Sequence, residues 1–587
     1  RGPIWIAAGV VVGLAFGRFS AAAFGSWTYV LGVVVGALAG ANLPLIFNRF
    51  NAVFTQLQTR YARLVQTLIQ ARRWVMVGLG SGLVITALAF ASVPSGFIPE
   101  EDQGYLAGIY QLQNGASLSA SEAMAKTIAA IIQEEPDVGE ASIISGYGFN
   151  GSSPDQGTIL IGLKPLEERK GATNSSFAIA KRLNARLTTL SEGFAKVGQP
   201  PAVPGFSAQG GFYFQFNDHS NGAYSFNQLN QLAQTLISKG RSSGDFASLY
   251  TQFIPSAPAF GLSINRELME ALDVDYQEAM TTIATLAGSK YTGLTYEAGQ
   301  VRNVYVQSSA EQRSRIDDIL SYYVRARDGS LVQVSQFARN SLSSAPPVIS
   351  HYNLDRTVLV QGAQAAGTSS GEALGAIQRL FDAQNFNNIG SAFTGLAALQ
   401  LSAGNASLLV FGFGVLVVYL VLSAQYESYI TPVIILMTVP LAMLGALAFL
   451  ALRSIDLNIY AQVGLVTLIG LAAKNGILIV EVAEQHLEAG MSATDAVIAS
   501  AESRLRPILM TAIAALAGFL PLVVANSAGA QSQQSLGTVI FGGLVVATVL
   551  SLGVVPPFYV VIKGLEEHLF GQTPPGADDD DSLASAN

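Results

Sequence analysis

The chain alternates between long apolar runs and stretches of ordinary soluble composition. Six runs carry almost no charge and are about 18–25 residues long, which at ~1.5 Å per residue is enough for a helix to cross a bilayer. They lie at 74–93, 406–424, 429–452, 459–482, 508–525 and 538–562. The pattern therefore predicts one transmembrane helix, a large extramembrane region, and then a bundle of five transmembrane helices.

The two ends of the chain have patterns of their own. Residues 1–47 are apolar on both sides of Arg18, and we interpret them as a membrane-associated helical hairpin of unknown role. Residues 48–73 are amphipathic, with five arginines and no acidic residue, which predicts a cytoplasmic surface helix and places the extramembrane region outside. The acidic segment 571–587 is predicted to be disordered. Because the chain begins with Arg1 and has no signal-peptide pattern, we expect a piece of a longer polypeptide.

The extramembrane region repeats a strand–helix–strand pattern. The first copy consists of a strand at 105–112, a capping box of Ser119 and Glu122 opening a helix to about 133, and a strand at 140–146. The second consists of a strand at 212–216, a capping box of Ser225 and Gln228 opening a helix to about 239, and a strand at 248–253. Later signals are a strand at 259–264, helices at 266–272 and 275–287, a strand at 358–364 and a helix at 370–383. The repeat predicts two small α/β subdomains.

The composition narrows the class of protein. Hydrophobic residues make up 50% of the chain and charged residues 12%, which indicates a membrane protein with a soluble part. The absence of cysteine excludes disulfides and thiolate metal sites. With a net charge of −8 and no basic run, we expect no nucleic-acid partner. The four histidines lack metal-ligand spacing and no nucleophile–base set appears, so we expect neither a metal, a cofactor nor an enzyme.

Lys474 stands in the middle of the apolar run 459–482. A lysine near the centre of a bilayer costs roughly 3 kcal/mol on insertion scales, so it is expected to be paired or functional. The apolar runs contain no aspartate. Glu481 offers a local alternative, but seven residues of helix separate the two by roughly 10 Å. We therefore expect the counter-charge of Lys474 to come from outside this sequence.

Other polar residues form weaker patterns. Arg504 and Thr511 are seven residues apart at the start of the fifth run, which fits a polar path across the bundle, although arginines there also snorkel to the interface. The glycine-rich loop after the strand at 140–146 carries Tyr147 and Phe149, which could grip an apolar ligand or simply cap a core. Phe212 and Phe214 alternate along one strand, a pattern typical of a core.

Three motifs together resemble a known family. They are FIPEEDQG at 97–104, GLAAKNGILIVEVAEQ at 470–485 and RLRPILMTAIAALAGFLPLV at 504–523. With the one-plus-five helix layout, the chain from about 43 to 564 resembles the C-terminal half of resistance-nodulation-division (RND) transporters, in the hydrophobe/amphiphile efflux branch.

The resemblance implies a fold. It is a membrane α-helical bundle of one plus five transmembrane helices with a large α+β periplasmic region of ferredoxin-like βαβ porter subdomains and a docking subdomain. The implied boundaries are 101–211 for the first porter subdomain, 212–257 with 347–400 for the second, 258–346 for the docking subdomain and 406–562 for the five-helix bundle.

The resemblance also implies a function. Such proteins are proton-driven antiporters of the bacterial inner membrane that export hydrophobic or amphiphilic drugs, detergents and dyes, with the proton gradient in place of a cofactor. The implied partners are the N-terminal half of the same transporter, two further copies in a homotrimer, a periplasmic adaptor and an outer-membrane channel. In the family the lysine matching Lys474 pairs with two aspartates of the N-terminal half, and residues matching Arg504 and Thr511 complete the proton relay.

The resemblance finally implies two substrate sites. The residues implied for the deep pocket and its switch loop are Ser142, Ile144, Gly146, Tyr147, Gly148, Phe149 and Leu160. Ser142 and Leu160 stand where phenylalanines are common, which predicts a less aromatic pocket. The residues implied for the access pocket are Phe212, Phe214, Tyr250 and Gln252. Since arginine and asparagine are common at the last two positions, the charge preference of the substrate stays open.

Two alternatives remain at this point. The heavy-metal branch of the same superfamily would need soft ligands, and the porter region offers only Met124, Met269 and Met280, without close pairing. The other alternative is a non-transporting scaffold or sensor derived from a pump half, which would be indicated if the N-terminal half lacks transmembrane acids.

Overall fold

The computed structural model describes residues 49, 51–148, 151–169, 171–203, 210–365, 367–526 and 529–570. The predicted hairpin at 1–47, Phe149 and the predicted acidic tail at 571–587 lie outside these residues. The chain divides into two compact units, which we call the helical unit (1–101 with 400–587) and the sheet unit (102–399). Each unit is described by itself.

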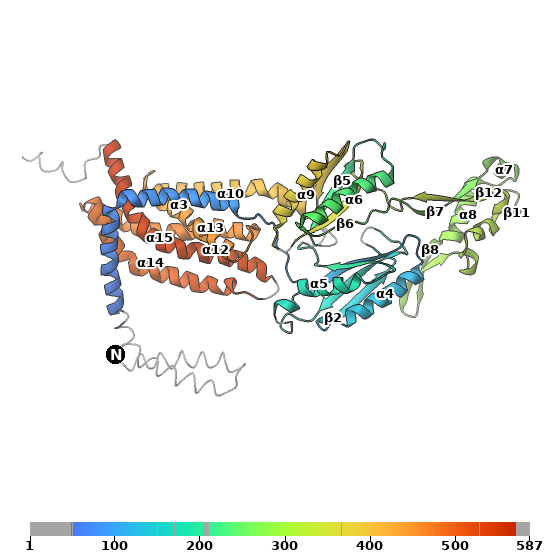
Figure 1. Cartoon of the computed structure of the whole chain (residues 1–587), viewed down its shortest axis with the longest axis horizontal. Helices are drawn as coiled ribbons and strands as arrows, with labels where there is room; N and C mark the ends of the chain where they lie inside the picture. Colours follow the sequence, from blue (N-terminus) through green and yellow to red (C-terminus); the bar gives the residue numbers. More distant parts are fainter. Residues whose placement is uncertain are drawn as a thin grey trace, which may run out of the picture. The chain divides into compact units, whose positions relative to one another are not determined.

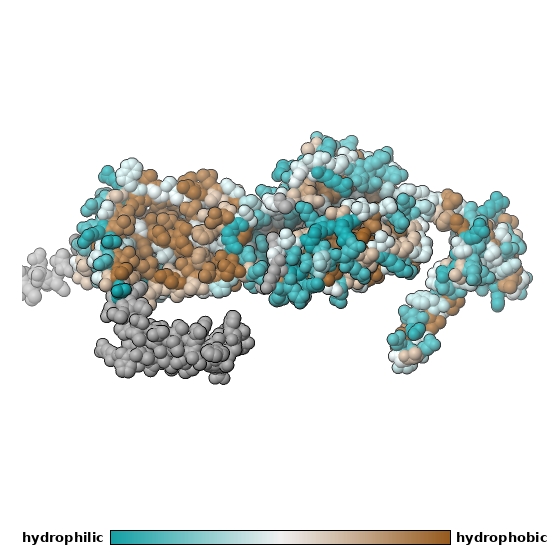
Figure 2. Space-filling view, turned by 60° about the horizontal axis from the view of Figure 1, so that its bottom comes forward, coloured by the Kyte–Doolittle hydropathy of each residue, from teal (hydrophilic) through white to brown (hydrophobic). Residues whose placement is uncertain are grey.

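The helical unit holds the long apolar helices. Its helices are α3 (Arg72–Ser92), α10 (Leu396–Tyr426, which begins in the sheet unit), α11 (Thr431–Leu436), α12 (Thr438–Leu452), α13 (Ile459–Glu488), α14 (Ala493–Val523) and α15 (Ala530–Phe570). Within the described residues six stretches are long and apolar enough to cross a membrane: one each in α3, α10, α13, α14 and α15, and one across α11 and α12. The face of this bundle seen in Figure 2 is predominantly hydrophobic, as lipid contact requires.

Small residues let the central helices α12, α13 and α15 approach one another closely. A Cβ on Gly445 would lie 2.4 Å from Val546, and one on Gly543 would lie 2.2 Å from Leu468. Both positions therefore require glycine, as is common where membrane helices pack backbone against backbone. α13 consequently lies in the interior of the bundle, with Ala472, Asn475 and Gly476 buried.

A separate helix at 51–70 precedes α3 and turns into it at Ala71. It runs at a steep angle to α3 (Figure 1). The Tyr61 hydroxyl donates to the Leu552 carbonyl at 2.9 Å, and the Gln58 amide donates to the Glu502 carbonyl at 3.2 Å. This amphipathic helix thus packs against α14 and α15.

The first sheet of the sheet unit and its two helices are, in chain order, β1 (Tyr105–Leu112), α4 (Leu118–Gln133), β2 (Val138–Ser145), β3 (Gln156–Leu163), α5 (Ser176–Leu187) and β4 (Gly193–Gly198). Its strand order is β2-β3-β1-β4, and each neighbouring pair is antiparallel. β1 and β2 are therefore parallel with β3 inserted between them, which is the split βαβ, or ferredoxin-like, topology. α4 and α5 lie side by side over one face of this sheet (Figure 1).

The second sheet repeats the same topology. Its elements are β5 (Phe212–Asp218), α6 (Phe226–Ser243), β6 (Phe246–Thr251), β14 (Asp355–Gln364), α9 (Ser370–Gln384) and β15 (Ile389–Thr394), with the short β13 (Ser350–Tyr352) also paired to β14. β6 pairs with β14, β14 with β5, and β5 with β15, all antiparallel. The two sheets are therefore copies of one design.

An insert separates β6 from β14. Its elements are β7 (Ala257–Ile264), α7 (Arg266–Ala271), α8 (Tyr276–Gly288), β8 (Lys290–Glu297), β9 (Gln300–Val306), β10 (Tyr323–Arg325), β11 (Leu331–Gln333) and β12 (Ala338–Ala345). β7 and β12 pair with each other as the two strands that leave and rejoin the second sheet. The insert has its own core around Met269, Val334 and Phe337, so it folds as a separate lobe.

The predicted helix caps are partly right. The capping box of Ser225 and Gln228 is confirmed at the start of α6. The box predicted at Ser119 and Glu122 is wrong, because Ser117 is the N-cap of α4 and accepts a hydrogen bond from the Ala120 N–H. The helix begins earlier than predicted, since Ser117 already offers a hydroxyl to the free N–H groups of the first turn.

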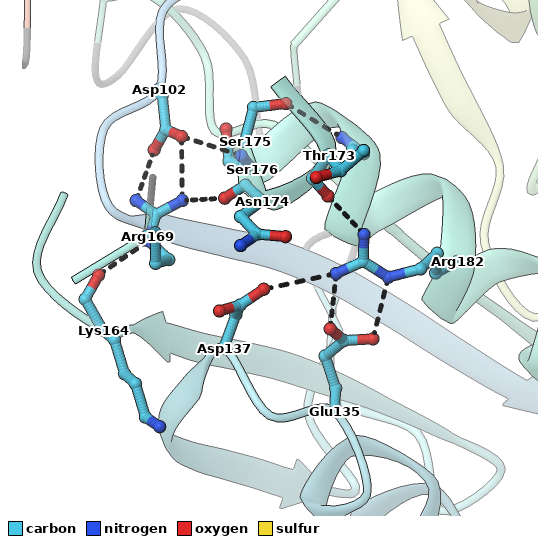
Figure 3. A network of polar contacts seen from close by, with 11 residues as sticks. Asp102, Glu135, Asp137, Lys164, Arg169, Thr173, Asn174, Ser175, Ser176 and Arg182 are labelled. Carbon is cyan, nitrogen blue, oxygen red and sulfur yellow. Dashed lines mark hydrogen bonds and ion pairs between the residues drawn. The ribbon is translucent and has the colours of Figure 1, made fainter. Parts of the chain in front are cut away.

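Two adjacent carboxylates follow α3. Glu101, in the helical unit, accepts hydrogen bonds from the Ser532 hydroxyl and, at 2.9 Å, from its N–H, so it caps the start of α15. Asp102, in the sheet unit, binds Arg169 through both oxygens at 3.0 Å and accepts from the Ser176 N–H at 2.7 Å (Figure 3). The side chain of Arg169 is only 1% exposed.

The Asp102–Arg169 pair is predicted to stabilise the sheet unit in a pH-dependent way. Burial raises the pKa of Asp102, but hydrogen bonds from Arg169, Ser176 and Gly104 outweigh burial and hold it below its ordinary value. A lowered pKa means that the stabilisation is present above the unfolded value near pH 4 and is lost as pH falls below it. Arg169→Met should cost roughly 3–5 kcal/mol, because it leaves a half-buried carboxylate unpaired.

Hydrogen-exchange protection of β1 measures this effect, with Arg186→Met as the matched control. Arg186 pairs with Glu134 at an exposed site, where an ion pair contributes about 0–1 kcal/mol. Equal losses of protection in the two variants would contradict the prediction, as would an Arg169→Met protein with the acid sensitivity of the wild type.

Candidate functional site

Lys474 lies on the one exposed stripe of α13 in the middle of the bundle. Val463, Thr467, Gly470 and Lys474 are exposed and follow the 4-3-4 spacing of one helix face, while the residues between them are largely buried. Among the ion pairs of the described residues none includes Lys474. The local alternative, pairing with Glu481, is wrong here, because the Glu481 carboxylate instead accepts from Gln485 at 3.2 Å.

The other lysine of the bundle is paired. Lys563 of α15 lies 3.0 Å from a carboxylate oxygen of Glu484 and 3.2 Å from one of Glu566. All three side chains lie near the C-terminal ends of α13 and α15. The described part of the bundle thus supplies two carboxylates to Lys563, a lysine that links α13 and α15, and none to Lys474.

Arg504 lies at the same height in the bundle as Lys474. α13 and α14 are joined by residues 489–492 and run antiparallel, and the Ser500 hydroxyl donates to the Ile479 carbonyl at 2.5 Å. Five residues back along α13 from Ile479 and four or five forward along α14 from Ser500 place Lys474 level with Arg504. Two cations at one level repel each other unless an anion lies between or beside them.

Thr511 lies ~10 Å further along α14 than the level of Lys474, at ~1.5 Å per residue. Its hydroxyl donates to the Ile508 carbonyl of its own helix at 3.1 Å, and Arg504 is half-buried. In the described part of the chain no hydrogen bond or ion pair joins Lys474, Arg504 and Thr511. The structure therefore brings Lys474 and Arg504 to one level but does not connect the predicted relay.

Strand register gathers several predicted pocket residues on one face of the first sheet. One row across the sheet is Ser142, Leu160 and Ala107, and the next row is Ile144, Thr158, Ile109 and Lys196. α4 and α5 pack against the opposite face, where Tyr110 and Ile159 belong to the core. Leu160 and Ile144 are 39% and 43% exposed on this helix-free face, as a ligand-binding role would require.

The predicted switch loop crosses that row. The Thr158 hydroxyl donates to the Tyr147 carbonyl at 2.8 Å, so the loop lies over the row between Ile144 and Ile109. Gly146 has φ +80°, a conformation that favours glycine, and Gly148 and Gly151 exchange backbone hydrogen bonds. The side chain of Tyr147 is 53% exposed. Phe149 lies outside the described residues.

The access-pocket role predicted for Phe212 and Phe214 does not fit the structure. Both side chains are buried, Phe214 completely, in the core that β5 forms with α6 and α9. The Phe214 ring contacts the rings of Phe381 and Phe393 edge to face. Since side chains alternate along a strand, the residue that β5 presents on its helix-free face is Tyr213.

Tyr250 does lie on the helix-free face of the second sheet, in a row with Gln361 and Tyr213. Its hydroxyl donates to the side-chain amide oxygen of Gln361 at 2.9 Å, and the Gln252 side chain hydrogen-bonds Tyr250. The Tyr250 ring also contacts the first sheet, with its centroid 6.1 Å from that of Phe194 and 4.6 Å from the Lys196 ammonium. The helix-free faces of the two sheets therefore meet at Tyr250.

A protein-family model described as the AcrB/AcrD/AcrF family matches residues 30–563. The chain belongs to the AcrB/AcrD/AcrF family. This is the resistance-nodulation-division group that the three motifs indicated, so the predicted resemblance is confirmed. The family consists of membrane transporters and not enzymes, in agreement with the apolar helices and the separate sheet-rich unit.

Several efflux pumps of this family are similar to the chain. The toluene efflux pump membrane transporter TtgB of Pseudomonas putida is 33% identical over 536 residues, covering 91% of this chain and 50% of TtgB. The multidrug resistance protein MdtF of Escherichia coli is 32% identical over 548 residues, covering 92% of this chain and 52% of MdtF. The chain therefore spans about half the length of the curated relatives it matches.

The methionines that the heavy-metal alternative would need as ligands do not lie together in this member of the AcrB/AcrD/AcrF family. Met124 is buried in the core of the first sheet, while Met269 and Met280 pack into the core of the insert. Within the described residues no group of three or more His, Asp or Glu side chains could hold a metal ion.

Sequence reasoning missed Lys196, Phe194 and Tyr213. The signal was present in the period-2 alternation of both strands: Ala195 and Val197 are the core residues of β4, which leaves Phe194 and Lys196 on the other face. In the segment FYFQF at 212–216, the three phenylalanines likewise lie on the core face of β5, and Tyr213 lies on the opposite face. Assigning the two faces of each strand from this alternation would have identified all three residues.

We predict that Phe214 and Tyr213 differ in what their substitution changes. Phe214→Ala should destabilise the second sheet by roughly 3–5 kcal/mol, because it empties a fully buried aromatic site. Tyr213→Ala, on the neighbouring half-buried position, should leave stability within about 1 kcal/mol. Hydrogen-exchange protection of β5 and β14 provides the measurement. A stable Phe214→Ala protein would show that Phe214 lies on an accessible wall after all.

Proposed function

We propose that the chain forms the C-terminal half of an inner-membrane, proton-driven antiporter that exports hydrophobic or amphiphilic compounds. Family membership and similarity to transporters named for antibiotic, toluene and multidrug efflux support efflux as the activity. The single observation that carries the proton-coupled part is Lys474, a lysine on an exposed stripe of a central bundle helix with no counter-charge among the described residues.

The proposed partner of Lys474 is a carboxylate on the other half of the transporter. The exposed stripe of α13 is narrow and contains Gly470, so a second helix can approach the backbone closely there. Lys474 and Arg504 at one level present two positive charges to such a helix. Two carboxylates on that helix would neutralise both cations. Without the cations, these carboxylates would be as costly in the bilayer as the lysine itself.

Proton coupling then follows from the charge balance. When the carboxylates are ionised, they hold Lys474 and draw the two helix groups together. When a proton from the outer side neutralises one carboxylate, the attraction falls, Lys474 is released and the helices shift. Arg504, at that level of α14, and Thr511, about two turns further along the same helix, are proposed to stabilise the alternative arrangements.

The sheet unit is the proposed periplasmic, substrate-binding part. Its two helix-free sheet faces offer exposed apolar side chains, including Leu160 and Ile144, beside a loop that contains two glycines and Tyr147. We propose that substrates bind there. A homotrimer, a periplasmic adaptor and an outer-membrane channel would carry them on, with the insert at 258–346 as the docking lobe.

The decisive prediction concerns Lys474→Met in the complete transporter with both halves. The variant should reach the membrane at wild-type abundance and assemble normally, because Lys474 makes no ion pair within this half. It should nevertheless lose nearly all proton-driven dye efflux, measured in cells as dye accumulation. Lys474→Arg keeps the charge and should retain part of the activity.

The matched control is Lys563→Met, which removes a lysine already paired with two glutamates. That variant should lower stability and abundance, with efflux per molecule largely kept. Full dye efflux by an abundant Lys474→Met transporter would contradict the proposal and favour a scaffold or sensor role.

A further inference from the structure

We propose that Lys196 is a specificity-determining residue that binds the anionic head of amphiphilic substrates, with the apolar body of the ligand against Phe194 and Tyr250. This inference rests on the proposed function, because it names a substrate class for the same sheet faces. The ligand class is an organic anion, such as a carboxylate or a sulfonate, joined to a rigid apolar body.

Lys196 is a half-buried cation without a counter-charge. Among the described residues it enters no ion pair, and its ammonium lies 4.6 Å from the Tyr250 ring centroid. Among the described residues, the charged or titratable groups that interact with this cluster are Arg241 on α6, Tyr250 on β6 and Tyr213 on β5, and none of these is an anion at neutral pH. On its own sheet the neighbouring residue across the ladder is the apolar Ile109.

Two other cations of the sheet unit, one buried and one half-buried, are neutralised by carboxylates of the described residues. Arg169 is bound by Asp102, and Arg356 is bound by Asp218. Because an uncompensated charge in a partly buried site is unfavourable, the missing anion at Lys196 indicates that a ligand supplies it. Burial, helped by the nearby charge of Arg241, lowers the pKa of Lys196 to about 8, so the ammonium is still mostly protonated at pH 7.

The apolar part of the ligand has a surface beside the cation. Phe194 is two residues from Lys196 on the same face of β4, which places the two side chains ~7 Å apart along the strand. Phe194 is 45% exposed, and its ring lies 6.1 Å from that of Tyr250. A cation, an exposed aromatic ring and a phenol at these separations match an anionic amphiphile better than a cationic or a fully apolar compound.

The test measures binding without transport. The complete transporter, with both halves, is placed in nanodiscs of neutral lipid with no proton gradient, and equilibrium dialysis measures binding of cholate and of its uncharged methyl ester at pH 7. Lys196→Met should weaken cholate binding about 10-fold or more and leave the ester unchanged, because only the charge-assisted contact is lost. Phe194→Ser should weaken both ligands to a similar extent.

Two further variants and a change of pH separate the charge of Lys196 from other effects on binding. Lys126→Met, at an exposed position of α4, should bind both ligands as the wild type does. Raising the pH from 7 to 9 takes Lys196 through its pKa of about 8, so wild-type cholate binding should weaken while ester binding stays constant. Lys196→Arg should bind cholate equally at both pH values, because arginine stays protonated.

Wild-type cholate affinity in Lys196→Met would overturn the inference, and so would an equal loss of cholate and ester, which would indicate a structural role. These results are independent of proton coupling. If cholate binding follows Lys196 while Lys474→Met still transports, the proposed antiport fails and the anion site stands. If Lys474→Met abolishes efflux while Lys196→Met binds cholate normally, only the anion site fails.

Discussion

A positive charge inside an apolar bundle is the constraint on which this protein depends. Within the described residues, Lys474 lies on the exposed face of the middle of α13, at the level of a second cation, Arg504. The same bundle gives Lys563 two carboxylates, so the lack of an anion at Lys474 is specific to that face. In the proposed antiporter, stability in the membrane and movement under a proton gradient would both depend on the group that neutralises this lysine.

In the sheet unit, too, neutralised and unneutralised cations differ in where they lie. Its two ferredoxin-like sheets each turn one face to their own helices and the other away from them. Cores form on the helix side, and the residues available to ligands alternate with the core residues along every strand. Arg169 and Arg356 are neutralised internally, whereas Lys196 at the meeting point of the helix-free faces is not.

Much of this arrangement could be predicted from the sequence. Runs without charge located the long helices, and the repeated strand–helix–strand pattern located both sheets, because periodicity and caps are local signals. The order of strands, in which β3 separates β1 from β2, is set by contacts across the sheet, and only the ferredoxin-like fold implied by the family resemblance predicted it. The resemblance implied Leu160 and Ile144 as pocket residues; both are exposed on one face of the first sheet, and their pocket role stays a prediction. Phe212 and Phe214 are instead buried core residues, because alternation along β5 leaves Tyr213 on the other face.

The neighbouring residues Glu101 and Asp102 have a mechanical consequence. Each carboxylate is fixed by its own set of hydrogen bonds, one at the first turn of α15 and the other beneath β1. Successive Cα atoms are ~3.8 Å apart across a planar peptide, so very few soft torsions separate the two anchors. Within the sheet unit, Asp102 lies only three residues before Tyr105, the first residue of β1, so its bonds to Arg169 hold the start of that strand. The same strand carries Ile109, the neighbour of Lys196 in the ladder.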